Sequence, residues 1–265
     1  KLYDGEGWAY WTLSQNELAI ISFKKAIEIF QAINNKAGEI VSLNGLGWAN
    51  KFLGQTENAF NLIFESIKIA KETEDRNGLF TIYSNLALFY TIEDKYKDAI
   101  NALESGNQYS DIANLNDSIA VNYFAKGRID LWKGNFMSSA NNFKASNEKF
   151  ELNNDKTNIV WTHASYILAC TMQGDIDVTD DLSFLHNRIS DGWLLDIDYP
   201  DVYFHLYKIY KELDDSDKAQ SYLDFSYRKI IKLSECIQET KYKKSYFEMN
   251  YRKKIISEWE SYNKK

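Results

Sequence analysis

The chain has 265 residues, of which 45% are hydrophobic and 26% are charged. This composition excludes a disordered or collagen-like protein. A formal net charge of −7 makes it a poor general binder of nucleic-acid backbones. One proline and 12 glycines supply few turns for a sheet protein of this length, so long helices joined by short polar turns are favoured.

Elements recur along the chain with a period of forty residues, and each unit is predicted to contain a helix, a tight turn, a second helix and a loop. The tight turn falls on residue types that are common after a helix end, where glycine and aspartate accept the left-handed conformation more readily than most. From the N-terminus these turn residues are Ser14, Gly54, Asp94, Gly134, Gly174 and Asp214. The units so defined are about 1–35, 36–75, 76–115, 116–155, 156–195 and 196–238.

Small residues recur seven positions before each turn and let a second helix approach closely. This column, meaning a set of residues forty positions apart, is Gly7, Gly47, Ala87, Gly127, Ile167 and Tyr207, and it degrades in the last two units. A matching small column on the second helix begins Ala19, Ala59, Ala99 and Ser139. Large apolar residues follow four positions later at Phe23, Ile63, Leu103 and Phe143, on the same helical face.

Asparagine and aspartate mark the loops between units because their side chains bond nearby backbone groups. These loops are Asn34–Lys36, Asp75–Asn77, Asn114–Asp117 and Asn153–Asp155, with a longer irregular loop over Asp191–Tyr199. One further helix over 240–262 is predicted to cap the array with a polar outer face. Residues 228–265 hold eleven basic and five acidic side chains, which we interpret as a solvated terminal helix.

These columns resemble the tetratricopeptide repeat, most closely in the first unit at Gly7, Tyr10, Ala19, Phe23 and Ala26. The resemblance implies a right-handed α-solenoid over essentially the whole chain. The family's proline at the unit end is absent, and the unit is about six residues longer than the family's common length. In this the chain resembles long-helix arrays at the C-termini of multidomain signalling ATPases, nucleotide cyclases and regulators. Because it starts at Lys1 inside an expected helix, we interpret it as a segment of a larger protein. We expect that protein to be cytoplasmic.

In the family the first helix of each unit lines a concave groove, so the resemblance implies a set of partner-binding residues here. The set is Trp8, Trp11, Asn44, Trp48, Lys51, Phe52, Ser84, Leu88, Phe124, Arg128, Trp132 and Trp161, with Asp4, Thr12, Thr91, Leu131, Ala164 and Leu168 beside them. Trp and Arg are the residue types that dominate binding interfaces. The alternative is that these rings pack between helices and meet no ligand. The family's carboxylate clamp is missing, because Asp4, Trp8, Asn44 and Trp48 occupy its positions.

Residues for catalysis or metal binding are not grouped in the sequence. His163, His186 and His205 fall in separate units, and Cys170 and Cys236 have no activating partner nearby in the chain. The two cysteines form neither a disulfide framework nor a metal quartet, and no apolar run reaches the roughly 18 residues of a membrane helix. We therefore expect no enzyme activity, no cofactor, no metal, no membrane contact and no nucleic-acid partner.

Two functions remain open, with catalysis by the segment itself a remote third. The first is a scaffold that binds a peptide or partner protein in its groove and regulates an attached or partner signalling protein. The second is a superhelix that senses a small ligand in the groove and gates a neighbouring ATPase, cyclase or transcription-regulator domain.

Overall fold

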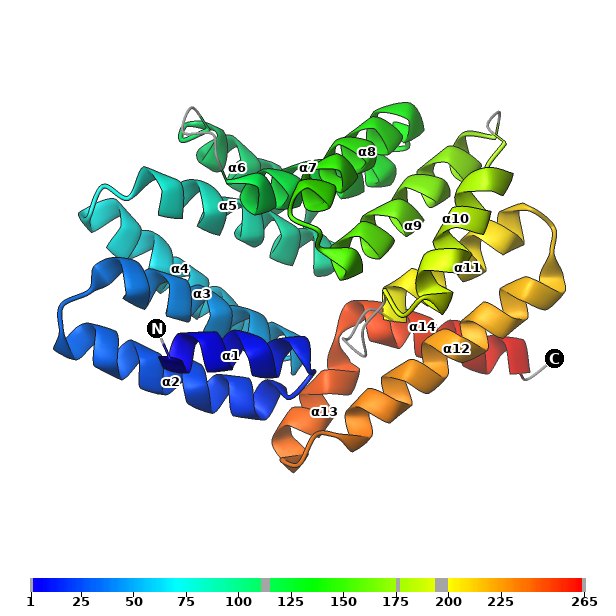
Figure 1. The fold of residues 1–265 in the computed structure, drawn as a ribbon. Helices are drawn as coiled ribbons and strands as arrows, with labels where there is room; N and C mark the ends of the chain where they lie inside the picture. Colours follow the sequence, from blue (N-terminus) through cyan, green and yellow to red (C-terminus); the bar gives the residue numbers. More distant parts are fainter. Residues whose placement is uncertain (1, 111–114, 175–176, 194–199, 264–265) are drawn as a thin grey trace.

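The computed structural model describes residues 2–110, 115–174, 177–193 and 200–263. Within these ranges it contains fourteen α-helices and no strand, so the predicted all-α class is confirmed. Neighbouring helices pack in pairs, as in a helical-repeat solenoid (Figure 1). The pairs are α1 (Leu2–Thr12) and α2 (Asn16–Ala32), α3 (Lys36–Phe52) and α4 (Thr56–Glu72), α5 (Arg76–Ile92) and α6 (Tyr96–Asn107), α7 (Asn116–Lys133) and α8 (Phe136–Leu152), α9 (Lys156–Gln173) and α10 (Thr179–Ser190), and α11 (Pro200–Glu212) and α12 (Ser216–Glu235). The tail holds α13 (Thr240–Glu248) and α14 (Asn250–Asn263).

The backbone at the tight turns follows the predicted pattern. All six turn residues, from Ser14 to Asp214, have a positive φ between 56° and 88°. Asn35, Asp75 and Asp155 each cap the next helix, because the side chain accepts a hydrogen bond from the backbone N–H three residues later. The loop residue Asn114 and residues 194–199 of the expected longer loop lie outside the described residues.

Close packing between the paired helices rests on the small column. A Cβ atom at Gly7 would lie 2.7 Å from the Phe23 ring, and one at Gly127 would lie 2.6 Å from the Phe143 ring. Each ring therefore occupies the space that a side chain on the first helix would take. Ile167 occupies the same position in the fifth unit and is fully buried. In that unit a large apolar side chain therefore fills the space between the helices that a ring fills in the first and fourth units.

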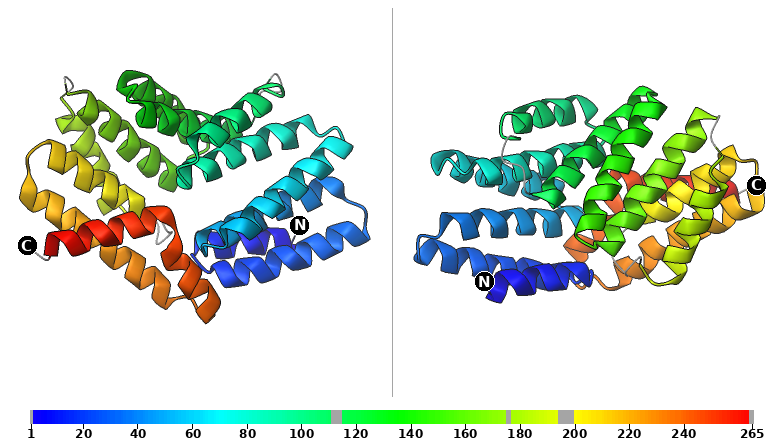
Figure 2. Two further views of the ribbon diagram at one scale, coloured as in Figure 1. Left: turned by 180° about the vertical axis from the view of Figure 1, so that it is seen from behind. Right: turned by 45° about the horizontal axis from the view of Figure 1, so that its top comes forward.

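The apolar interior is continuous along most of the array. One cluster of buried side chains extends from Ile40 in α3 to Ile255 in α14, and a second joins the first unit to α3. A single repeat unit is too thin to bury its own apolar face, so stacking neighbours is what creates this interior. The helix pairs follow an arc, and the tail lies between the first and the last pairs (Figures 1 and 2).

The tail differs from the single capping helix expected over 240–262, because it consists of two helices that meet at Met249. The ψ angle of Met249 is 134°, which ends α13 without any proline or glycine. The break buries both Met249 and Tyr246 and lets α14 pack on α12 of the last unit. Tertiary packing thus overrides a sequence that has no local helix breaker at this point.

The tail also contacts the first two units, which closes the arc. The Glu17 carboxylate of α2 accepts hydrogen bonds from the backbone N–H groups of Gln238 at 2.9 Å and Glu239 at 2.8 Å. The Ser245 hydroxyl donates to the carbonyl oxygen of Leu53 at 2.6 Å. A Cβ at Gly54 would lie 2.0 Å from the Ser245 carbonyl oxygen, so this close approach requires glycine. The tail therefore joins the two ends of the array.

Candidate functional site

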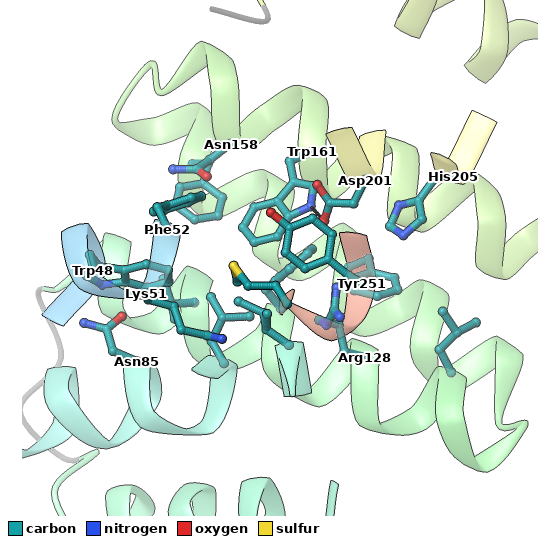
Figure 3. A pocket seen from close by; sticks show the side chains of 18 of the residues that line it. Trp48, Lys51, Phe52, Asn85, Arg128, Asn158, Trp161, Asp201, His205 and Tyr251 are labelled. Atoms are coloured by element: carbon teal, nitrogen blue, oxygen red, sulfur yellow. Dashed lines mark hydrogen bonds between the residues drawn. The ribbon is translucent and has the colours of Figure 1, made fainter. Parts of the chain in front are cut away.

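The first helix of each unit faces a central cavity of about 530 Å³, which we call the lumen. The period of forty turns the same helical face inward in every unit. One column of lumen residues is Trp8, Trp48, Leu88, Arg128, Leu168 and Lys208. The tail supplies Met249, Tyr251 and Lys254, and Figure 3 shows Tyr251 among side chains of the repeat units. The expected groove is therefore a lumen that the tail bounds on one side.

Eleven of the twelve predicted partner-binding residues line this lumen. They are Trp8, Trp11, Asn44, Trp48, Lys51, Phe52, Leu88, Phe124, Arg128, Trp132 and Trp161. The twelfth, Ser84, is fully buried, and its hydroxyl donates to the carbonyl oxygen of Phe80 at 2.9 Å. The structure thus brings the set together, and binding by these residues stays a prediction.

The aromatic residues at the first two units pack against one another at their edges. Trp11 makes edge-on contacts with Trp8, Trp48 and Phe52, with ring centroids between 5.5 and 6.2 Å apart. Trp48 and Phe52 are stacked at 6.1 Å. All four side chains are half-buried, so each is held by its neighbours and still presents surface to the lumen.

The other lumen aromatics divide into buried and exposed rings. Trp161 is buried against Phe124, with centroids 4.2 Å apart, and its indole N–H donates to the Asp201 carboxylate at 2.9 Å. Trp132 is 51% exposed and stacks on Tyr96 at 4.8 Å. Phe124 and Trp161 are therefore fixed by packing, whereas Trp132 offers an open ring.

Amide side chains add hydrogen-bonding groups to the lumen. The Nδ2 atom of Asn85 donates to the Oδ1 atom of Asn44 at 3.1 Å across α3 and α5. Asn158 lies in the wall formed by α9 (Figure 3). Such amides can bond the backbone of an extended peptide, which has one donor and one acceptor per residue.

Lys51 has a structural role beneath the lumen surface. It is almost fully buried and forms an ion pair with Glu93 in the turn after α5. Burial lowers the pKa of the Lys51 ammonium group, and the negative charge of Glu93 opposes this shift. Because its charge is already paired, Lys51 is a weaker candidate for a ligand-binding residue than its position in the sequence indicates.

The sequence analysis missed the lumen residues of the sixth unit and the tail. Asp201 lies forty residues after Trp161, and Lys208 lies forty residues after Leu168, so the period itself could have identified both. His205 and Phe204 accompany them on α11. The tail residues carried no comparable signal, because they stand outside the repeat.

Two ionisable groups on α11 are strongly affected by burial. Burial raises the pKa of the Asp201 carboxyl group, although Arg128 and the Trp161 N–H favour its charged form. Burial holds the pKa of His205 well below its usual value, and Lys208 and Arg128 lower it further. His205 is therefore neutral near pH 7, and it lies 3.3 Å from the Ser165 hydroxyl oxygen.

Across the described ranges, no cluster of three or more His, Cys, Asp or Glu side chains is placed to hold a metal ion. Cys170 is buried and Cys236 is exposed, and both are free thiols. None of the described helices combines the length and the apolar character needed to cross a membrane.

The fold and the lumen define a helical-repeat protein. Residues 1–32 match the family profile of the tetratricopeptide repeat, which confirms the resemblance in the first unit. The crystal structure of BtubC (BKLC) from P. vanneervenii is similar, with a TM-score of 0.54 and 19% identity over 84% of this chain and 94% of that chain. At this identity the likeness shows the fold alone. No curated protein sequence matches the chain.

Proposed function

We propose that the chain is a protein–protein interaction module that binds a peptide or an extended segment of a partner protein in its lumen. The match to the tetratricopeptide repeat supports a general interaction module. Through this binding the module regulates an attached or partner signalling protein in the cytoplasm. A catalytic role is not proposed, because this repeat is typically non-catalytic.

The observation that carries the proposal is the composition of the lumen wall. Half-buried tryptophans held by their neighbours provide apolar surface at little cost in side-chain entropy. The paired amides of Asn44 and Asn85 provide polar groups beside them. Rigid aromatic surface together with backbone-binding amides suits a peptide that is gripped along its length.

The test begins with selection of peptides from a random library on the intact chain. Trp132→Ala removes an exposed lumen ring, and Trp48→Ala removes a half-buried one. We expect each to weaken the selected peptides about tenfold or more, as truncation of an interface anchor does. Phe225→Ala is the matched control, because Phe225 is 55% exposed and lies outside the lumen.

Far-ultraviolet circular dichroism of each variant checks that the helices remain formed. If the selected peptides bind both lumen variants as tightly as they bind the unaltered chain, they bind outside the lumen and the proposal is wrong. Loss of binding in Phe225→Ala alone would contradict it in the same way.

A second candidate is a ligand-sensing superhelix that gates a neighbouring ATPase, cyclase or transcription-regulator domain. The lumen volume of about 530 Å³ is in the usual range for small-molecule sites. A ligand there would touch both the repeat units and Tyr251 of the tail (Figure 3). A small molecule that binds only the folded chain raises its melting temperature, so a metabolite screen by thermal shift separates the two candidates. Absence of any hit disfavours the sensor.

A further inference from the structure

Two basic residues face the lumen from the same register of different units. Arg128 on α7 and Lys208 on α11 are eighty residues apart, and Leu168 occupies the position between them. The repeat places all three on the inward face of a first helix. The two positive charges are therefore directed into the lumen by the fold.

Neither cation has a carboxylate partner within 4.0 Å in the described part of the chain. One terminal nitrogen of Arg128 donates to the Thr91 carbonyl oxygen at a long 3.4 Å, and its Nε atom is buried without a hydrogen bond. The Lys208 ammonium lies 4.6 Å from the centre of the Phe204 ring. Arg128 is half-buried and Lys208 is exposed towards the lumen, and neither has all its donors paired, so both can bind a further acceptor.

The two nearby acids have partners of their own and act on Arg128 and Lys208 only beyond contact distance. Asp94, in the turn between α5 and α6, forms an ion pair of 2.7 Å with Lys254 of α14. Asp201 of α11 accepts the hydrogen bond of the Trp161 indole. With both carboxylates ionised, the three cations Arg128, Lys208 and Lys254 leave one positive charge in excess, and the raised pKa of Asp201 acts to increase that excess. The lumen therefore presents net positive charge to an anion.

The environment of Lys208 is suited to an anion. Its side chain is exposed, yet the surface that it exposes faces the lumen, where surrounding protein replaces much of the solvent. Burial, together with the positive charges of Arg128 and Lys254, lowers the Lys208 pKa to about 8, and the negative charges of Asp201 and Asp94 oppose the shift. An anion placed between the cations would relieve this repulsion.

We infer that Arg128 and Lys208 bind one carboxylate group of the ligand that occupies the lumen. The inference rests on the proposed function and specifies its ligand as a peptide that places one acidic side chain or its free C-terminus at this point. The family's carboxylate clamp uses other positions, where this chain has Asp4, Trp8, Asn44 and Trp48. The site inferred here instead joins the fourth unit to the sixth across the lumen.

The first experiment uses 3-phenylpropanoate, a monocarboxylate whose ring suits the aromatic wall, and follows intrinsic tryptophan fluorescence of the full chain. Its neutral isostere 3-phenylpropanamide and the more highly charged 2-phenylethylphosphonate are the comparison probes. We expect the carboxylate to bind at least about tenfold more tightly than the amide. Equal binding of carboxylate and amide, or no saturable binding of the carboxylate, overturns the anion site. Tighter binding of the phosphonate overturns the preference for a carboxylate.

Variants test which cations are responsible. Arg128→Gln and Lys208→Met should each weaken the carboxylate about tenfold and leave the amide unchanged. Lys144→Met on the outer helix α8 changes the net charge equally and should have no effect. Lys208→Arg keeps a permanent charge, so it should retain carboxylate binding and lose the weakening above about pH 8 that titration of Lys208 causes.

Peptides selected for the proposed function separate the two possible failures. A selected peptide and its form with the acidic group amidated are compared on the unaltered chain and on Lys208→Met. If both forms bind equally well and both depend on Trp132, the lumen binds peptides and the anion site is wrong. If neither depends on Trp132, the proposed function itself fails.

Discussion

The Nη1 atom of Arg252 in the tail donates a hydrogen bond of 3.0 Å to the carbonyl oxygen of Phe52, 200 residues earlier in the chain. Phe52 is the last residue of α3, where carbonyl groups have no partner within the helix. The same nitrogen donates to the Tyr246 carbonyl oxygen at 2.9 Å, and the guanidinium lies 3.4 Å from the centre of the Tyr246 ring. Arg252 is fully buried, so one side chain joins the second unit to both tail helices.

Replacement of Arg252 by methionine should open this closure. The variant keeps much of the apolar stem but leaves the carbonyl groups of Phe52 and Tyr246 without their donor. We expect the free energy of unfolding to fall by about 2–3 kcal/mol. The loss of the charged hydrogen bonds costs more than is gained by no longer burying a cation. Urea denaturation measures the stability, and small-angle X-ray scattering should show a larger radius of gyration.

Lys253→Met is the control for this prediction. Lys253 is the next residue, is exposed and pairs with Glu248 of the tail itself. Its replacement should change stability by less than about 0.5 kcal/mol. Equal stability and equal radius in the Arg252 and Lys253 variants would show that the tail does not hold the ends together.

The features that repeat with the period of forty could be predicted from the sequence. Turn residues such as Gly134 and lumen residues such as Trp48 follow from local backbone preference and from the shared helical face. The same register extends to Lys208, which the period places beside the lumen. A repeat is predictable because each unit buries the same helix faces against its neighbours.

The closure by the tail could not be predicted in this way. The contact between Arg252 and Phe52 depends on a tail residue that stands outside the repeat, and nothing near Met249 in the sequence ends a helix. Its basic residues suggested a solvated helix, whereas Arg252 is fully buried. A single long-range contact leaves no periodic trace, so only the folded arrangement reveals it.

Glu74 offers a test of the backbone at the loops between units. It has a φ of 53°, which is the left-handed region that non-glycine residues other than Asn and Asp seldom occupy, and it is exposed. Glu74→Gly should raise the free energy of unfolding by about 0.5–1 kcal/mol, because relief of the strain exceeds the added entropy of the unfolded chain. Glu65→Gly, the same exchange at an exposed site inside α4, should lower it by about 1 kcal/mol. Thermal denaturation measures both, and equal signs would contradict the assigned conformation.

Gly127 tests the close packing of α7 on α8. A Cβ there would lie 2.6 Å from the Phe143 ring, so Gly127→Ala should destabilise the chain by about 1–3 kcal/mol. Gly5→Ala is the control, because a Cβ at Gly5 meets nothing within 4 Å and alanine favours the helix. Adding Phe143→Leu to Gly127→Ala should cost less than the sum of the two single changes, measured by urea denaturation. Strict additivity would mean that the ring does not occupy the glycine's space.

The lowered pKa of Lys208 predicts how the stability of the ligand-free chain varies with pH. Its pKa in the folded chain is about 8, lowered from 10.5 by burial and by Arg128 and Lys254. Between these two values the unfolded chain binds the proton and the folded chain does not, so stability should rise as the pH increases from about 8 towards 10.5. Below pH 8 the full cost of the charged form is present, so Lys208→Met should be more stable than the unaltered chain at pH 7, and this advantage should shrink at higher pH. Urea midpoints of both chains measured at several pH values give the difference, in which the other titrating groups largely cancel. A difference that stays constant with pH would show that Lys208 is solvated like a surface lysine, and the lumen would then lack the crowded positive charge on which the anion site depends.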